Sequence, residues 1–377
     1  MTARVLVLGA GFGGLEVAAG LSERFGGRVE VTLIDKRDAF VFGFAKLDVI
    51  AGERTADEVS YAYSGMHNPG VRFVRAEILS IDPAARSVHT DVGDFSADHL
   101  VIALGADLDP AATPGLAEAG HEYYSTEGAF AARDVLAGFT GGRVVIGVAT
   151  PVFKCPPAPS ETALVVDEYL RAAGLRDASE VSLVMPWPSP VPPVPAASEA
   201  FLAAFAERGI RWHGDHVIER LDAGSREVVF ADGHRLGYDL FLGVPKHVVP
   251  PVVAAAGLAP EGWVQVDRQT FRTRYEEVYA IGDVTDAGVP KAGTFAMGQA
   301  RVVTAEIAER IDAEAETPAY DGAGICYIGF GGGTVAQIGG TFRDGAPVHP
   351  VFETPSTANA EVKEAFRRAQ ARRWLGA

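Results

Sequence analysis

The N-terminal segment 1–35 contains the pattern that most restricts how this chain can fold. An apolar strand is predicted over 5–9, a helix over 14–25 and a second strand over 29–35. Glycines at positions 9, 11 and 14 give the turn after the first strand the spacing G-x-G-x-x-G. The second strand ends in Asp35, at an offset of 21 from the last of these glycines (35 − 14). Strands, helix, glycines and acid together predict a βαβ unit that binds a dinucleotide.

Each position in this pattern has a physical task. The first glycine permits a tight turn, the second lets the backbone approach a pyrophosphate, and the third lets the helix pack on the strand. The helix N-terminus attracts the anion, and the acid accepts hydrogen bonds from a ribose. A chance match is the alternative in a chain with 43 glycines, but chance does not account for the flanking strands and the acid. The nucleotide-binding residues predicted here are Gly9, Gly11, Phe12, Gly13, Gly14, Asp35 and Lys36.

An internal repeat extends the prediction to the whole fold. The segments 71–106 and 210–245 match with a one-residue slip, and their starting positions differ by 139 (210 − 71). The strands that begin at 5 and 143 differ in position by 138 (143 − 5). Duplication explains both offsets, and features of the first copy resume after residue 245. The predicted fold is therefore α/β with two Rossmann-like dinucleotide-binding domains, the second inserted into the first, plus a small C-terminal region. The predicted limits are 1–108 with 246–315, then 109–245, then 316–377.

The second copy lacks the glycine turn of the first. Its strand over 143–147 runs into Ala149, Thr150 and Pro151 and arrives at Cys155. A pyrophosphate would meet these side chains where the first copy has glycines. We therefore expect the second domain to bind no nicotinamide nucleotide.

A strand that ends near residue 282 completes the predicted nucleotide site. Gly282 and Asp283 follow it, and a long helix is predicted after Gly293. A carboxylate at the C-terminal end of a strand can bind a ribityl or ribose hydroxyl in an open α/β sheet. The following helix N-terminus can stabilise the negative charge of a reduced flavin. The alternative for Asp283 is an ordinary strand-end aspartate that caps a turn.

These segments resemble the FAD signatures of the pyridine nucleotide-disulfide oxidoreductase superfamily. The residues that carry the resemblance are GAGFGG at 9–14, LVIALG at 100–105 and IGDVTD at 281–286, and the likeness covers nearly the whole chain. It implies FAD as the cofactor and adds Ala103, Gly105, Gly293 and Thr294 to the predicted cofactor site.

One branch of that superfamily is a closer match. FKCPPAPSE at 153–161 is similar to the cysteine loop of sulfide:quinone oxidoreductases and of the flavoprotein subunit of flavocytochrome c sulfide dehydrogenase. ICY at 325–327 resembles their second cysteine site, and PKAG at 290–293 resembles a loop near their flavin. The chain lacks a third cysteine that many of these enzymes carry. The segment 40–46 also lacks the cysteine through which the flavocytochrome subunit attaches its flavin, so the FAD is expected to be non-covalent.

The resemblance implies that Cys155 and Cys326, the chain's only cysteines, form a redox pair. They must then meet in space although they lie in distant parts of the sequence. Lys154 precedes Cys155, and a helix with Ser160 as its N-cap is predicted to follow. A positive charge and a helix N-terminus both lower a thiol pKa, so Cys155 is expected to be activated. The alternative is two buried thiols that only pack.

Three further side chains are weaker candidates for chemistry. Glu161 is a candidate proton relay, or else a first-turn acid that favours the helix dipole. Lys291 is a candidate to hold negative charge near the flavin or a quinone carbonyl, or else a solvated loop lysine. His247 is a candidate proton shuttle, or else a packed histidine. No group of His, Cys or Asp has the spacing of a metal site, so no metal is predicted.

Charge and composition narrow the partners. The net charge of −16 opposes general binding to nucleic acid. No run of about 18 apolar residues suggests a membrane span, and the apolar start is read as a nucleotide-binding strand and helix rather than a signal peptide. A cytoplasmic location is expected. The basic tail at 361–374 is either a helix for peripheral contact with the inner face of the membrane or with a partner, or a helix whose aromatics pack on the body.

The function predicted from these features is sulfide:quinone oxidoreductase-like. Sulfide would be oxidised through Cys155 and Cys326, and FAD would pass the electrons to a quinone or another acceptor. Two alternatives stay open: an NADH:acceptor oxidoreductase of the type II kind, and a flavin electron-transfer subunit that acts with a protein partner.

Overall fold

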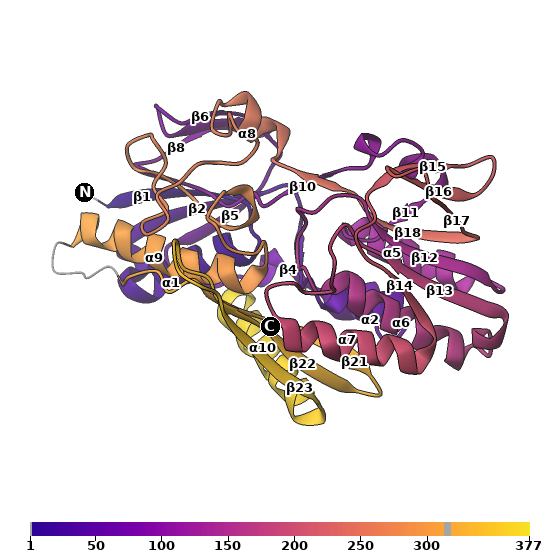
Figure 1. The fold of residues 1–377 in the computed structure, drawn as a ribbon. Helices are drawn as coiled ribbons and strands as arrows, with labels where there is room; N and C mark the ends of the chain where they lie inside the picture. The colour runs from indigo at the N-terminus through magenta and orange to yellow at the C-terminus, as the bar shows by residue number, and fades with distance from the viewer. Residues whose placement is uncertain (1, 313–317) are drawn as a thin grey trace.

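A computed structural model describes residues 2–312 and 318–377 and contains two similar α/β units side by side (Figure 1). The central sheet of the first unit is parallel, with strand order β20-β9-β1-β2-β5. Helices α1 (Phe12–Phe25) and α9 (Gly293–Ile311) pack against each other beside it. The strands are β1 (Ala3–Leu8), β2 (Val29–Asp35), β5 (Val71–Arg75), β9 (His99–Ile102) and β20 (Val278–Ala280).

The second unit repeats this plan within the first. Its parallel sheet has the order β11-β18-β12-β13-β14, which places equivalent strands in equivalent positions. The strands are β11 (His121–Glu122), β12 (Gly142–Val148), β13 (Ser179–Val184), β14 (Ile210–His213) and β18 (Leu240–Val244). Because β20 returns to the first sheet after the second is complete, the second unit is an insertion. The expected pair of Rossmann-like units is confirmed.

Each unit also carries a three-stranded antiparallel meander, as the internal repeat predicts. The strands of the two meanders are β6 (Ile78–Asp82), β7 (Ser87–Thr90) and β8 (Gly93–Ser96), and β15 (Ile218–Asp222), β16 (Glu227–Phe230) and β17 (Arg235–Gly237). The chain leaves the first unit along β10 (Asp107–Asp109) and returns along β19 (Lys246–Val248), and these two strands pair antiparallel. This two-stranded crossing joins the units.

The C-terminal region forms a third layer that contacts both units (Figure 1). It consists of the antiparallel strands β21 (Ala323–Gly331), β22 (Thr334–Thr341) and β23 (His349–Ser356), followed by helix α10 (Thr357–Leu375). Strand β21 packs against α6 (Ala158–Ala172) of the second unit and against α9 of the first. The residues of β21 therefore lie where the two units meet.

The remaining elements connect or cover these layers. They are β3 (Ala39–Val41), β4 (Ser60–Ala62), α2 (Ala45–Ile50), α3 (Ala56–Val59), α4 (Leu116–Ala119), α5 (Thr126–Ala137), α7 (Pro195–Arg208) and α8 (Pro251–Ala255). Among the described residues, none of the helices has both the length and the apolar character that crossing a membrane requires.

One predicted boundary is wrong. Helix α6 begins at Ala158 with Pro157 as its N-cap, so Ser160 is not the cap but a buried residue of the first turn. Prolines 157 and 159 fit there because the first helical residues have no intrahelical acceptor for an N–H that proline lacks. The early start brings the helix closer to Cys155, whose carbonyl oxygen accepts a hydrogen bond from the amide of Ala158 at 2.9 Å.

Candidate active site

The turn between β1 and α1 has the geometry of a phosphate cradle. Gly9 adopts φ +96°, and a Cβ there would lie 2.5 Å from the carbonyl oxygen of Ala103. A Cβ on Gly14 would overlap the carbonyl oxygen of Gly9, so α1 packs directly on the turn. A Cβ on Gly11 would meet nothing within 4 Å, and no side chain caps the helix there. The open face at Gly11 and the free helix N-terminus therefore fit a pyrophosphate.

Asp35 stands at the end of β2 as predicted for a ribose ligand. Its Oδ2 accepts a hydrogen bond from the amide of Ala10 at 2.8 Å, and its Oδ1 accepts one from the amide of Arg37 at 2.9 Å. These bonds fix the carboxylate beside the glycine turn and leave lone pairs for hydroxyl donors. The side chain of Lys36 is exposed next to it.

Asp283 lies at the C-terminal end of β20, half-buried behind Gly282, whose φ is +76°. Burial raises the pKa of its carboxyl group, and the cations of Lys154 and Lys291 oppose that rise. In the described part of the chain no hydrogen bond to this carboxylate is found. An unpaired carboxylate at this edge of the sheet suits the hydroxyl-binding role predicted for it.

Lys291 and Thr294 are held by the protein itself. The Nζ of Lys291 donates to the carbonyl oxygens of Asp283 at 2.7 Å and Thr285 at 2.9 Å, and it lies 3.6 Å from the ring centroid of Trp263. Burial lowers the pKa of Lys291 to about 8. The hydroxyl of Thr294 donates to the carbonyl oxygen of Ile325 at 2.9 Å and accepts from its amide at 3.1 Å. Both side chains therefore build the site by ordering the backbone around it.

Gly293 allows the start of α9 to meet the start of α1. A Cβ on Gly293 would lie 2.6 Å from the ring of Phe12. A Cβ on Gly13 would lie 3.0 Å from Ile281, just before the turn that carries Asp283. The backbone amide of Ala103 donates to Leu8 at 2.8 Å, and Gly105 adopts φ +69° with open space beside it. These predicted cofactor residues therefore surround the same end of the first sheet.

The structure brings the two cysteines together. Both side chains are half-buried and pack against the same apolar cluster, and the thiol of Cys326 lies near enough to raise the pKa of Cys155. Cys155 adopts φ +49° in the loop before α6, and its amide donates to the carbonyl oxygen of Lys291 at 2.7 Å. Cys326 comes from β21, where it faces Ile338 of β22. The cysteine loop, the flavin-side loop and the C-terminal sheet therefore converge at one place.

The predicted activation of Cys155 is wrong for the dithiol form. The interaction with the Cys326 thiol is the largest cause that raises the pKa of Cys155 well above its usual value, and burial and the carboxyl of Glu161 add to it. Lys154 does not turn toward the sulfur, because its Nζ donates to the carbonyl oxygen of Ala106 at 3.0 Å. The cation that lowers the pKa of Cys155 is Lys46 of α2.

Lys46 is a site residue that the sequence reasoning missed. Burial lowers its pKa to about 7, and its Nζ donates to the carbonyl oxygen of Tyr124. A signal was available, because Lys46 closes the apolar run that begins at Phe40. A lone lysine that ends an apolar segment is buried at a cost and needs a partner.

Glu161 and His247 are both buried near the cysteines. Oε1 of Glu161 accepts from the amide of Gly329 on β21 at 2.6 Å, and burial raises its pKa to about 7. Glu161 therefore ties the helix after Cys155 to the strand that carries Cys326. Burial lowers the pKa of His247 to about 3, and its Nδ1 lies 3.0 Å from the carbonyl oxygen of Pro245. His247 is thus a neutral, packed residue near neutral pH.

The second unit has no equivalent phosphate cradle. Nine residues, 149–157, separate β12 from α6, where three residues, 9–11, separate β1 from α1. Prolines at 157 and 159 remove two amide donors from the start of α6, and the amide of Ala158 is already bonded to Cys155. At the position where a second pyrophosphate would meet a free helix N-terminus, the second unit instead carries the loop of Cys155.

The basic tail packs on the body, which is the second of the two alternatives raised for it. Trp374 is buried, contacts the rings of Phe12, Phe40 and Phe42, and donates from Nε1 to Oε2 of Glu16 at 3.0 Å. Basic residues of α10 pair with acids: Arg373 with Glu16 and Glu23, Lys363 with Asp48, and Arg367 and Arg368 with Glu364.

Comparison with known proteins agrees with this architecture. The family model of pyridine nucleotide-disulphide oxidoreductases matches residues 3–305. The chain belongs to this family. It is 24% identical to the mitochondrial sulfide:quinone oxidoreductase of Mus musculus over 339 residues, which cover 86% of this chain and 75% of that one. The type II NADH:quinone oxidoreductase of Staphylococcus saprophyticus is 35% identical over 115 residues, which cover 30% of this chain and 29% of the relative.

A solved structure shares the fold throughout. The sulfide:quinone oxidoreductase from Aquifex aeolicus superposes with a TM-score of 0.89 at 24% identity and covers 100% of this chain and 93% of that chain. Membership of the pyridine nucleotide-disulphide oxidoreductase family makes the protein an FAD-dependent oxidoreductase, and the cradle at Gly11 and the carboxylates of Asp35 and Asp283 fit that cofactor.

Proposed function

We propose that this flavoprotein oxidises sulfide through Cys155 and Cys326 and delivers the electrons to a quinone. The observation that carries the proposal is the proximity of the two thiols, which come from distant parts of the chain, pack against the same apolar cluster and lie beside the loop that carries Lys291. A packing role for the thiols does not explain why the loop before α6 is lengthened to place one of them there. Similarity to sulfide:quinone oxidoreductases over most of the chain supports the same reading.

The proposed reaction begins with the pair as a disulfide. HS⁻ attacks one sulfur, so that a bond forms between the incoming sulfur and that cysteine while the disulfide breaks, leaving a persulfide on one cysteine and a thiolate on the other. A second HS⁻ attacks the outer sulfur of the persulfide and releases HSSH and a second thiolate. The sum is 2 HS⁻ → HSS⁻ + H⁺ + 2 e⁻. The bound flavin would supply a two-electron acceptor for the thiolates, which return to the disulfide, and the same group would then donate the electrons to the quinone.

The chain's own residues orient and charge this centre. The amide of Cys155 is anchored to Lys291, and Thr294 anchors Ile325 beside Cys326, so both sulfurs are held by the flavin-side helix and loop. The ammonium of Lys46 favours the thiolate of Cys155 and attracts HS⁻. Glu161, with a pKa of about 7, is placed to hold the released proton near neutral pH.

The proposal also covers the cofactor mode and the acceptor. We infer non-covalent FAD, because the segment 40–46 beside the cradle contains no cysteine. Val348, Val351 and Val362 of the C-terminal region are exposed, and the proposal includes approach to a membrane-borne quinone through this region. Location in the cytoplasm, with peripheral contact at the inner face of the membrane, remains the prediction made from the sequence.

NADH oxidation is the second candidate, because a type II NADH:quinone oxidoreductase is 35% identical over part of the chain. The rebuilt start of α6 disfavours it, since a nicotinamide nucleotide would lack its pyrophosphate site in the second unit. A partner-dependent electron-transfer subunit is less favoured, because four of the five basic side chains of α10 that would dock a partner are paired with acids of the same chain.

The test is an anaerobic titration of the yellow holoprotein, following the flavin absorbance with sulfide and separately with NADH. Sulfide is expected to bleach the wild type, and Cys155→Ser and Cys326→Ser are each expected to abolish the bleaching. Val152→Ala, an exposed change in the same loop, serves as the control and should bleach normally. Bleaching by NADH alone, or bleaching by sulfide that survives both cysteine variants, would overturn the proposal.

A further inference from the structure

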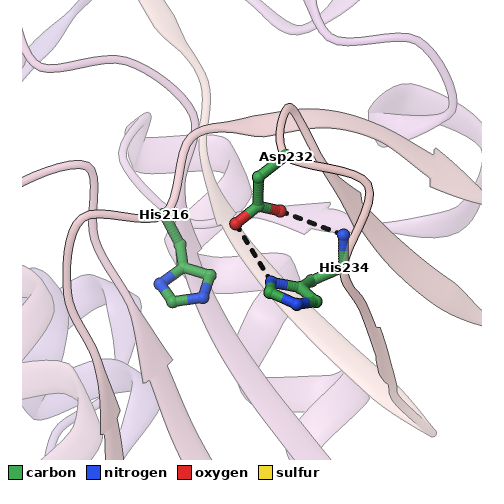
Figure 2. Close-up of side chains that lie close together, drawn as sticks. All are labelled: His216, Asp232 and His234. Carbon is green, nitrogen blue, oxygen red and sulfur yellow. Dashed lines mark hydrogen bonds and ion pairs between the residues drawn. The ribbon is translucent and has the colours of Figure 1, made fainter.

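The meander of the second unit brings together three side chains that are far from the cysteines in the fold. His216 lies in the loop before β15, and Asp232 and His234 lie in the turn between β16 and β17 (Figure 2). One ligand atom from each residue falls within 4.8 Å of the other two. The sequence shows no metal-site spacing here, because His216 is remote from the other two in the chain and only the pairing of the strands joins them.

The backbone holds the two loops in this arrangement. The amide of Ala231 donates to the carbonyl oxygen of Val217 at 2.9 Å, which sets His216 opposite Asp232. Gly233, at φ +86°, closes the turn, and its amide donates to the carbonyl oxygen of Phe230 at 2.9 Å. The cluster is therefore built on paired strands rather than on a free loop.

The His216 ring is oriented for an outside ligand. Its Nδ1 lies 2.6 Å from the carbonyl oxygen of Gly214, and its ring makes a T-shaped contact with the ring of Phe230 at a centroid distance of 4.8 Å. A carbonyl oxygen can only accept, so Nδ1 carries the proton and Nε2 presents a lone pair. A histidine that donates its other nitrogen to a carbonyl is the usual arrangement of a metal ligand.

Asp232 completes the donor set with negative charge. Its Oδ1 accepts from the backbone amide of His234 at 3.0 Å, and its Oδ2 lies 3.1 Å from Nδ1 of the His234 ring (Figure 2). The ring of His213 lies in a T-shaped arrangement with that of His216, at a centroid distance of 6.0 Å.

We propose that His216, Asp232 and His234 bind a divalent transition-metal ion of the zinc class. Two imidazoles and one carboxylate are ligands that Zn²⁺ takes at about 2.0–2.2 Å, with water in the remaining position. Ligand atoms of a tetrahedral site lie about 3.3 Å apart, and the exposed side chains of Asp232 and His234 can close from the present spacing by rotation. Mg²⁺ and Ca²⁺ are disfavoured because they prefer all-oxygen ligand sets.

The ion would join two segments of the second unit. The loop of His216 is already hydrogen-bonded to the segment that follows β13. The amide of His216 donates to the carbonyl oxygen of Met185 at 3.1 Å, and the amide of Asp215 donates to that of Trp187 at 3.0 Å. A ligand shared with the β16–β17 turn would tie that loop to the meander. Binding to the folded state alone therefore raises the temperature of unfolding.

The first unit supplies a matched control. In its meander, at β7 and β8, Nδ1 of His89 lies 2.6 Å from Oδ1 of Asp94, so this exposed pair copies one half of the cluster. The described residues place no third His, Cys or acidic ligand within reach of this pair. His89→Ala therefore removes an exposed histidine beside an aspartate without touching the proposed site.

The experiment is a Zn²⁺ titration of chelator-treated, tag-free holoprotein by calorimetry. It uses a Cys155→Ser, Cys326→Ser background so that the thiols bind no zinc. One ion per chain is expected, together with a higher unfolding temperature. His216→Ala, Asp232→Asn and His234→Asn should each weaken binding by about tenfold or more, while His89→Ala leaves affinity unchanged.

Using three variants separates loss of zinc binding from loss of folding. His216→Ala also removes contact with Phe230, whereas Asp232→Asn and His234→Asn change exposed side chains. Loss of affinity in the two exposed variants supports the proposal whatever the first one does to stability. Affinity that is unchanged in both, or no zinc bound at all, overturns it.

Discussion

At the scale of single residues, Glu161 is a buried carboxyl group whose ionisation costs folding free energy. The structure buries its carboxyl between α6 and β21 and raises its pKa from an ordinary value of 4.5 to about 7. Below pH 4.5 the folded and unfolded states both hold the proton. Between pH 4.5 and 7 only the folded state holds it, so stability falls as the pH rises, by about 3 kcal/mol in all.

Glu161→Gln is therefore expected to stabilise the protein at pH 8 and to change little at pH 4.5, because glutamine keeps an acceptor for the amide of Gly329 and never ionises. Urea unfolding of the two proteins at both pH values measures this. Glu168→Gln is the matched control, because Glu168 lies on the same helix and accepts from the amide of Gly332 at 3.0 Å but is exposed. An equal effect of the two substitutions at pH 8 would contradict the burial argument.

The glycines of the first turn make a second residue-scale prediction, because they differ in what a methyl group would meet. Gly11→Ala should leave the apoprotein as stable as the wild type, since the methyl enters open space, yet weaken FAD binding by about tenfold or more because it occupies the pyrophosphate's path. Gly14→Ala should destabilise the fold itself, since its methyl overlaps Gly9.

FAD titration of the apoproteins and their thermal unfolding separate these effects. Gly27→Ala is the control, because a Cβ there also meets nothing within 4 Å but lies at the far end of α1. Normal FAD affinity in Gly11→Ala would place the pyrophosphate elsewhere.

At the scale of elements, α10 anchors its C-terminal end in the core of the first unit despite its basic sequence, because Ala371, Trp374 and Leu375 are buried. The Trp374 ring packs in the aromatic cluster beside α1. The carboxylate of Glu16 accepts hydrogen bonds from Trp374, Arg301 and Arg373. Removing residues 361–377 would therefore open the core of the first unit, and loss of activity in such a truncation would report unfolding as readily as loss of a partner.

Trp374→Ala is expected to lower the free energy of unfolding by about 3–5 kcal/mol, because it leaves a large cavity. Trp374→Phe keeps the ring contacts and loses one hydrogen bond, so it should cost about 1 kcal/mol beyond the lost volume. Urea unfolding measures both. A Trp374→Ala protein with wild-type stability would show that α10 does not pack as described.

At the scale of the whole molecule, the cysteine pair depends on contacts between the inserted unit and the C-terminal sheet. Arg208 of α7 donates to the carbonyl oxygen of Phe330 at 2.8 Å, and Glu161 and Glu168 of α6 hold the neighbouring amides of Gly329 and Gly332. The buried carboxylate of Asp167 pairs with Arg208 and with two further arginines. These bonds fix the end of β21 three or more residues beyond Cys326.

Arg208→Ala is expected to loosen β21 and to reduce the equilibrium for closing the disulfide between Cys155 and Cys326 by about fivefold, the equivalent of one hydrogen bond of about 1 kcal/mol. Equilibration in glutathione redox buffers measures it. Arg211→Ala, which removes an exposed arginine paired with Glu180, is the control. Equal closure in both variants would mean that the contact does not position the pair.

The sequence determined the parts of this protein that are local or repeated. The periodicity of the apolar residues, the glycine spacing and the acid at the end of the second strand predicted the first βαβ unit, because these signals all lie between positions 1 and 35. The nearly equal sequence offsets between the repeated segments predicted the inserted second unit. The cysteines could be singled out as the chain's only two, but their proximity follows from where β21 packs against α6, which no local pattern encodes.

Tertiary structure alone decided the pKa shifts of the site residues, which side chains are buried, and which distant side chains meet. The raised pKa of Cys155, the lowered pKa of Lys46, the burial of Glu161 and the packing of Trp374 depend on groups that come from other elements. The cluster of His216, Asp232 and His234 exists only because two strands pair in one register. Desolvation and Coulomb interaction act through space, so a linear reading of the chain could not assign them.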